Sequence, residues 1–184
     1  MLRSMADEAT KTASKGASRK GPTTLARAYF KALDDHDLDA ATALWKRGGI
    51  DRAIGLFELR APDELRSWFG TMFAAFPDIR FEVISVVAQK NEAAVRWVGR
   101  GTFDGTGKFE GLTPNGAEVE LQGCDVITVE DGLIVENNAY LNGADLARQL
   151  GALPPSGSAA ERAMTAALNA KVAAAKQLER LRDR

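Results

Sequence analysis

Two polar residues that could carry out chemistry lie inside the most apolar part of the sequence. Residues 119–129 and 133–141 read as two strands joined by a tight turn at 130–132, and Asp125 and Asn137 fall within them. An unpaired carboxylate is costly to bury, and asparagine is depleted in strands. Such positions indicate a satisfied polar network or a functional site.

Asp125 is the first candidate for a catalytic role. An enclosed apolar site would raise the pKa of this carboxyl group, which could then donate a hydrogen bond or carry a proton. Asn137 is expected on the inward face of its strand, where it could orient a carbonyl or stabilise an oxyanion. The alternative is a structural Asp125 that bonds to Tyr29, to Asn137 or to a backbone amide.

A tyrosine and four large side chains complete the predicted site. Tyr29 lies in a predicted N-terminal helix, and its hydroxyl could donate to a ligand oxygen. Otherwise Tyr29 is an ordinary core tyrosine. The side chains expected to line a ligand pocket, or else to belong to the core alone, are Trp45, Trp68, Met72 and Trp97.

Composition argues against several functional classes. The net charge is −1, so no overall field favours nucleic acid or an anionic membrane. Cys124 is the only cysteine and His36 the only histidine, so we expect no disulfide and no cysteine or histidine metal site. No apolar run approaches the roughly 20 residues that span a bilayer, and the N-terminus has no apolar signal core. We therefore expect a cytoplasmic protein without a metal or an organic cofactor.

The N-terminal half predicts an arm followed by alternating elements. Residues 1–22 contain almost no large apolar residue and are predicted to be a mobile basic arm. Helical spacing and capping residues predict helices over 25–33 and 38–45. A short strand region is expected at 50–59, and a third helix with a wide apolar face over 62–76.

The C-terminal half predicts a sheet and a separate helix. Strands are expected at 79–88 and 93–103, ahead of the two strands that hold Asp125 and Asn137. The glycine-rich loop 104–118 is a candidate pocket rim or lid. A short helix over 145–150 precedes a proline-rich linker and a long helix that Ser158 and Glu161 begin as a capping box.

Helices first and antiparallel strands last indicate the α+β class. We expect a curved antiparallel or mixed sheet wrapped over three N-terminal helices, as a cone with an apolar interior over residues 23–154. Residues 155–184 would form the linker and an extra amphipathic helix. Its thin apolar stripe needs a partner, either the sheet or another subunit.

Three segments resemble the nuclear-transport-factor-2-like superfamily and, within it, the SnoaL-like polyketide cyclase group. They read AYFKALDDHDLDAATALW (28–45), KFEGLTPNGAEVEL (108–121) and DVITVEDGLIVENNAYLNGADLARQLGALP (125–154). The second is close to that group's Gly-x-x-Pro-Thr-Gly loop, with Asn115 where threonine is usual. The resemblance implies the cone fold. The superfamily includes isomerases, cyclases, hydrolases, dehydratases and non-catalytic binders, so the fold does not select a function.

The resemblance extends to particular residues. Similarity to ketosteroid isomerases implies an oxyanion hole formed by Tyr29 and a protonated Asp125. The general base of those enzymes would fall near Ala53, which has no carboxylate, and Asp51 two residues earlier is only a weak match. The last-strand catalytic aspartate of the polyketide cyclases falls at Ala139, and Asp125 takes the place of a histidine. Each comparison therefore implies a polar pocket without the known base.

We expect the protein to bind a small, largely apolar, oxygen-bearing molecule that resembles a polyketide or a steroid. As an enzyme it would be an isomerase or cyclase that transfers a proton next to a carbonyl, with Asp125 as acid/base and with Tyr29 and Asn137 stabilising the oxyanion. One alternative is a non-catalytic ligand-binding or assembly module. Another is an epoxide hydrolase, for which Arg96 and Asp125 supply only part of the required Asp-Arg-Asp set. A homodimer through the outer face of the sheet is also expected.

Overall fold

The computed structural model describes residues 20–182, so most of the predicted arm lies outside the described residues. The helices of the described chain are α1 (Pro22–Asp34), α2 (Leu38–Ala43), α3 (Asp63–Ala75), α4 (Gly143–Gln149) and α5 (Ala159–Arg182). The strands are β1 (Trp45–Ala53), β2 (Phe57–Arg60), β3 (Arg80–Gln89), β4 (Glu92–Phe103), β5 (Ala117–Glu130) and β6 (Leu133–Leu141).

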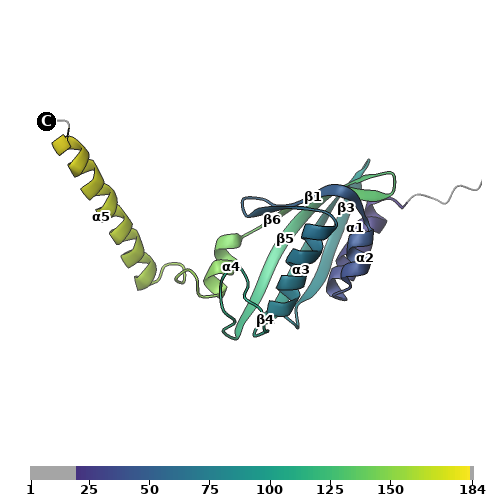
Figure 1. Ribbon diagram of the computed structural model, residues 1–184, viewed down its shortest axis with the longest axis horizontal. Coiled ribbons are helices and arrows are strands. Elements are labelled where there is room, and N and C mark those ends of the chain that lie inside the picture. The colour runs from purple at the N-terminus through teal and green to yellow at the C-terminus, as the bar shows by residue number, and fades with distance from the viewer. Residues whose placement is uncertain (1–19, 183–184) are drawn as a thin grey trace, which may run out of the picture.

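The strands form one open sheet in the order β2-β1-β6-β5-β4-β3. Neighbouring strands are antiparallel, except that β1 and β6 run parallel. Helices α1, α2 and α3 lie together on one side of the curved sheet, and α4 follows β6 (Figure 1). The prediction of an α+β fold with a mixed sheet wrapped over three N-terminal helices is confirmed.

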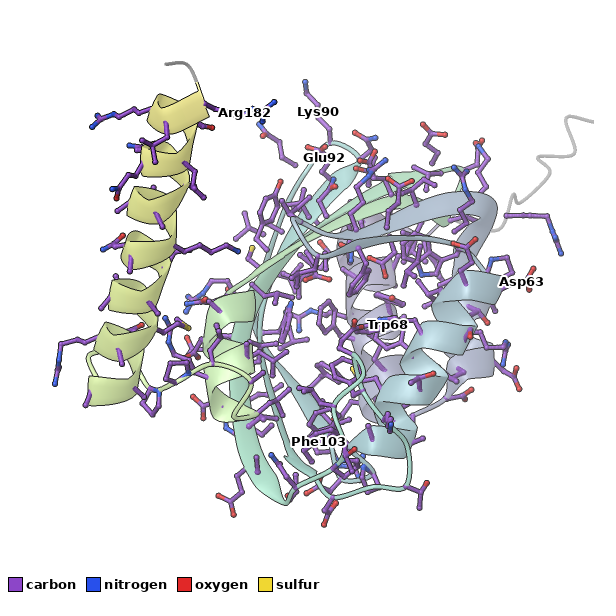
Figure 2. The ribbon with its side chains drawn as sticks, turned by 60° about the vertical axis from the view of Figure 1, so that its left-hand side comes forward. Asp63, Trp68, Lys90, Glu92, Phe103 and Arg182 are labelled. Carbon is purple, nitrogen blue, oxygen red and sulfur yellow. The ribbon has the colours of Figure 1, made fainter. Side chains whose placement is uncertain are left out.

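Helix α1 packs on the sheet because its apolar residues share one face. It packs chiefly against β3. The opposing strand β4 alternates, and its inward residues Ala93, Val95 and Trp97 are buried. Figure 2 shows Trp68 and Phe103 pointing into the space between the sheet and the helices. The side chains of α1 buried in this layer are Leu25, Ala26, Tyr29, Phe30, Ala32 and Leu33.

The predicted second helix is too long. Helix α2 ends at Ala43 and strand β1 begins at Trp45, so Gly48 and Gly49 lie within a strand instead of ending a helix. The pairing of β1 with β6 slips between Trp45 and Ile50, and Gly48 has a φ of +82°. A glycine pair is a common helix stop, but here it permits an irregularity in a strand.

The predicted strand region at 50–59 is in fact a hairpin. Strand β1 ends at Ala53 and β2 begins at Phe57, with Ala53 and Phe57 paired across the turn. Ile54 and Leu56 are exposed at the turn. The apolar run concealed the turn, because Ile54 and Leu56 read as strand residues although they lie at the tip of the hairpin.

Helix α5 projects away from the sheet and the other helices (Figure 1). Ser158 Oγ accepts the Glu161 N–H at 3.1 Å, which is one of the two bonds of the predicted capping box. The Glu161 carboxylate accepts the Gly157 N–H at 2.6 Å, instead of that of Ser158, and also Arg148 Nη2 of α4 at 3.1 Å. None of the helix residues is buried, so within the described chain the predicted stripe has no cover. Its large exposed members are Met164, Leu168, Val172, Leu178 and Leu181. No helix within residues 20–182 is long and apolar enough to cross a membrane.

Candidate functional site

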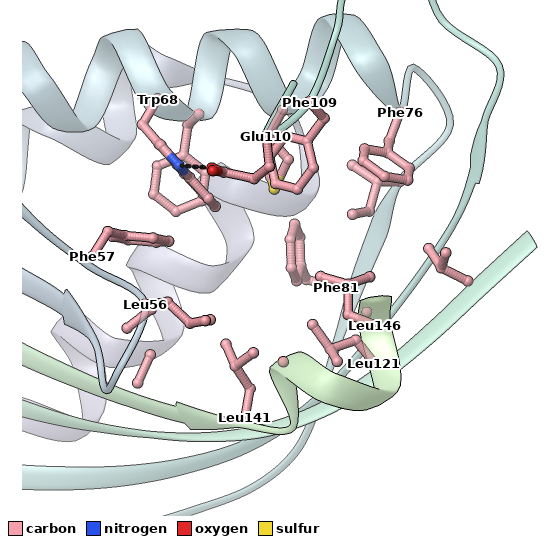
Figure 3. A pocket seen from close by; sticks show the side chains of 18 of the residues that line it. Leu56, Phe57, Trp68, Phe76, Phe81, Phe109, Glu110, Leu121, Leu141 and Leu146 are labelled. Carbon is pink, nitrogen blue, oxygen red and sulfur yellow. Dashed lines mark hydrogen bonds between the residues drawn. The ribbon is translucent and has the colours of Figure 1, made fainter. Parts of the chain in front are cut away.

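A cavity of about 470 Å³ lies between the sheet and helices α1, α3 and α4. This volume is typical of sites that bind small molecules. Figure 3 shows Phe57, Trp68, Phe76, Phe81 and Phe109 around its interior. A wall with so many rings favours a ligand with a large apolar body, because rings contribute extensive contact area and favourable stacking.

Four polar side chains enter this cavity from four elements. Tyr29 comes from α1, Asp51 from β1, Asp125 from β5 and Asn137 from β6, and each is at most 5% exposed. The register of the sheet explains their meeting. Asp51 is paired with Asn137, and Asn137 is paired with Ile127, two residues from Asp125. Paired residues and residues two apart share a face of the sheet, so all three polar side chains point inward.

Asn137 bridges the two carboxylates. Its Nδ2 donates to Asp51 Oδ1 at 2.9 Å and to Asp125 Oδ2 at 2.7 Å. With the amide turned the other way, its carbonyl oxygen would face the oxygens of both acids, where it could not donate a hydrogen bond. The two carboxylates therefore determine the orientation of the amide. Because both N–H groups are engaged, Asn137 bridges the two acids in this arrangement and presents no free N–H to a substrate carbonyl.

The two carboxylates differ in their remaining contacts. Asp125 Oδ1 accepts a short hydrogen bond from Trp97 Nε1 at 2.7 Å, so both oxygens of Asp125 are engaged. Asp51 Oδ2 has only a long contact, 3.4 Å, with the hydroxyl of Tyr29. Asp51 therefore keeps one oxygen available for a proton or for a ligand, whereas Asp125 does not.

Both carboxyl groups hold a proton more tightly than an exposed aspartate does. Burial raises the pKa of Asp125 to about 6, although hydrogen bonds from Trp97 and Asn137 favour the ionised form. Burial, and then the charge of Asp125, raise the pKa of Asp51 to about 7. The two groups titrate as a pair: Asp125 loses its proton first because it accepts two short bonds, and Asp51 then titrates against that charge. Near neutral pH the pair holds a single proton for much of the time.

Tyr29 remains a proton donor throughout this range. Burial, followed by the charges of Asp51 and Asp125, raises the pKa of Tyr29 well above its ordinary value. Its hydroxyl donates to Asp51 over a long distance, and the bond is weak enough to be exchanged for one to a ligand oxygen.

The predicted pocket residues divide into two groups. Trp68 and Met72 of α3 and Trp97 of β4 line the cavity. Trp45 does not line it: it is buried at the start of β1, and its ring packs edge-on against Tyr29 at 5.7 Å. Trp45 therefore belongs to the core, the alternative that the sequence left open, because it begins a strand instead of continuing the face of a helix.

Sequence reasoning gave too little weight to Asp51. The signal was available, because Asp51 alternates with Ala53, where a base was expected, and both residues line the cavity. Arg96, the residue considered for epoxide hydrolysis, is exposed and pairs with Cys124 across β4 and β5. Among the described residues, no arginine lines the cavity.

The glycine-rich loop after β4 forms part of the wall. The backbones of Phe109 and Leu112 are hydrogen-bonded to each other across a tight turn, and both side chains line the cavity. The loop is attached to the end of α3, since the Gly105 and Thr106 N–H groups donate to α3 carbonyl oxygens at 3.0 Å. Glu110 reaches from the turn toward Trp68, so this loop and α3 together border the cavity.

Solved structures with the same fold come from several bacteria. AclR from Streptomyces galilaeus, a candidate hydroxylase, superposes with a TM-score of 0.64 at 24% identity, over 86% of this chain and 95% of its own. IdmH from Streptomyces antibioticus, a candidate polyketide cyclase, gives a TM-score of 0.59 at 24% identity, over 72% and 99%. An LEH-like epoxide hydrolase of M. tuberculosis gives 0.56 at 16% identity, over 70% and 87%. At these identities the likeness establishes the fold alone.

Sequence comparison gives the family. No curated protein matches the chain. The family model of the SnoaL-like polyketide cyclases matches residues 23–150, which runs from the second residue of α1 through α4 and includes every residue of the buried polar network. The chain belongs to the SnoaL-like polyketide cyclase family.

Proposed function

We propose that the protein binds a small, largely apolar molecule with a carbonyl group and transfers a proton next to that carbonyl. The observation that carries the proposal is the buried pair of Asp51 and Asp125, bridged by Asn137 inside an aromatic cavity. Because Asp51 titrates near neutral pH, its ionised form can accept a proton from a weakly acidic C–H group and return it.

In the proposed reaction the free oxygen of Asp51 is the base. Asp51 Oδ2 takes a proton from the carbon next to the carbonyl, and the C–H electron pair moves into an enolate. The hydroxyl of Tyr29 donates to the enolate oxygen. Where a C=C bond lies next to the deprotonated carbon, the enolate extends over it as a dienolate, and Asp51 returns its proton to the far carbon, which shifts the double bond and completes an isomerisation. In an aldol-type cyclisation, the enolate carbon instead attacks a second carbonyl, whose oxygen takes the proton.

Asp125 and Asn137 support this base. The sequence led us to expect Asp125 as the proton carrier. Because both oxygens of Asp125 are engaged, we assign this role to Asp51 instead. The negative charge of Asp125 raises the proton affinity of Asp51, and Asn137 keeps the two groups at a fixed separation. The apolar cavity strengthens the effect of the Asp125 charge on Asp51, because an apolar environment screens charge poorly.

Two other functions remain as outcomes of the test. A non-catalytic binder would take the same apolar ligands without any proton transfer. Epoxide hydrolysis gains no support from Arg96, because this side chain is exposed and the described cavity wall contains no arginine.

The test is hydrogen exchange on simple ketones. Apolar aromatic ketones such as tetralone exchange the hydrogens next to their carbonyl with D2O, and NMR follows this exchange without knowledge of the natural substrate. We expect the protein to accelerate exchange, and Asp51→Asn to reduce that acceleration by about 10²- to 10⁴-fold, the usual contribution of a general base.

Asp104→Asn is the matched control, because it changes an exposed loop carboxylate in the same way. Unchanged exchange in Asp51→Asn would reject Asp51 as the base. Ketones that bind, as seen by calorimetry, without faster exchange would indicate the binding module instead.

A further inference from the structure

The cavity wall holds one carboxylate that the proposed proton transfer does not use. Glu110 lies beside the indole of Trp68, with Oε1 at 3.4 Å from Nε1 (Figure 3). Phe57 of β2 and Phe109 of the loop contact the same indole, with ring centroids 4.5 Å and 5.7 Å away. A carboxylate among aromatic rings has the chemistry that attracts organic ammonium groups.

Turn propensity does not explain the presence of a glutamate here. Glu110 and Gly111 form the two-residue turn between Phe109 and Leu112, and their φ angles are +48° and +80°. Turns of this kind favour asparagine or aspartate followed by glycine. A residue that departs from local preference beside a cavity is typical of a functional position.

The charge of the cavity wall also favours a cationic ligand group. Its ionisable acids are Asp51, Asp125 and Glu110, and among the described residues no lysine, arginine or histidine lines it. The hydrogen bond of Glu110 to Trp68 is long and involves an uncharged donor. An anionic ligand would meet only like charge in this wall, whereas a cationic group would bring the opposite charge to Glu110.

The geometry points to a ligand with a basic amine, bound as its ammonium form to the Glu110 carboxylate and beside the Trp68 indole. This inference rests on the proposed function for the remainder of the ligand, whose apolar body fills the cavity and whose carbonyl reaches Asp51. The substrate class is thus an amine-bearing, apolar carbonyl compound. A ligand delivered as a phosphate or carboxylate does not fit.

Three probes with the same naphthalene body separate charge from apolar contact. Naphthylethylamine, naphthylethanol and naphthylacetate are titrated into the full-length protein by calorimetry at neutral pH. We expect the amine to bind about tenfold more tightly than the alcohol, from one charge-assisted bond and one cation–π contact, and the acetate to bind most weakly. Glu110→Gln should remove the preference for the amine and leave the affinity for the alcohol unchanged.

Glu92→Gln is the control, because it removes the same charge from the exposed tip of β4, far from the cavity (Figure 2). It should keep the preference for the amine. Equal affinities of amine and alcohol in the wild type would overturn the inference. A preference that survives Glu110→Gln would also overturn it, because Asp51 and Asp125 would then hold the ammonium group. Failure of the alcohol to bind would instead overturn the proposed function of the cavity, and the inference with it.

Discussion

Replacing Asp51 by asparagine removes a buried carboxyl group whose ionised form the folded protein disfavours. Asparagine has nearly the same shape, and its carbonyl oxygen can still accept the bond from Asn137. The substitution therefore changes the charge of the site with little change in packing. Its effect on stability should depend strongly on pH.

The size of that dependence follows from the pKa. Burial, with the charge of Asp125, raises the pKa of Asp51 from 3.8 to about 7 in the folded protein. Between these values the folded state binds more protons than the unfolded chain, so the free energy of unfolding falls as pH rises through this window. At about 1.4 kcal/mol per pH unit, the full loss is about 4 kcal/mol, of which about 2 to 3 kcal/mol falls between pH 5 and pH 8.

Urea denaturation at pH 5 and pH 8 measures this difference. We expect the wild type to lose about 2 to 3 kcal/mol more than Asp51→Asn between the two conditions. The contributions of groups common to both proteins cancel in this comparison. The exposed-site control Asp104→Asn should follow the wild type. If wild type and Asp51→Asn showed the same pH dependence, Asp51 would titrate alike in the folded and unfolded states, and the reasoning would be refuted.

Three further predictions concern the residues around the site and α5. Trp97→Phe removes the donor to Asp125 Oδ1 and should lower the free energy of unfolding by about 1 to 3 kcal/mol, with a larger loss at pH 8 than at pH 5 in urea denaturation. Gly123→Ala would place a Cβ 2.3 Å from Trp97 Cζ2, so the indole must move; we expect a lower Tm and altered tryptophan fluorescence. Deleting residues 156–184 should change the free energy of unfolding by less than about 0.5 kcal/mol, because α5 has no buried residue, and light scattering will show whether the predicted dimer depends on α5.

Much of the fold could be predicted because most elements expose one face and bury the other. The helical repeat of α1 and α3 and the alternation of β4 and β5 are local patterns, and each element lies close to its predicted position. Strand β1 was harder to predict. Its glycine pair imitates the end of a helix, and its irregular pairing with β6 interrupts the alternation that would have marked a strand.

The part of the candidate site that lies in regular strands could be predicted from the sequence, and the part in the irregular strand β1 could not. Asp125 and Asn137 are polar residues in clear strands, so their positions stand out in the sequence. Asp51 lies in the irregular strand, and its hydrogen bond to Asn137 joins residues 86 positions apart. The parallel pairing of β1 with β6 brings them together, and no local pattern indicates a pairing over that distance.

The central claim is that Asp51 and Asp125 together retain a proton near neutral pH. A carbon-13 NMR titration of their side-chain carboxyl groups tests it directly, with Asp51→Asn and Asp125→Asn to assign the signals. We predict two coupled steps, with apparent pKa values of about 6 for Asp125 and about 7 for Asp51. Titration of both groups near pH 4, as in exposed aspartates, would contradict the account, because Asp51 would then bind a proton taken from a carbon only weakly at neutral pH.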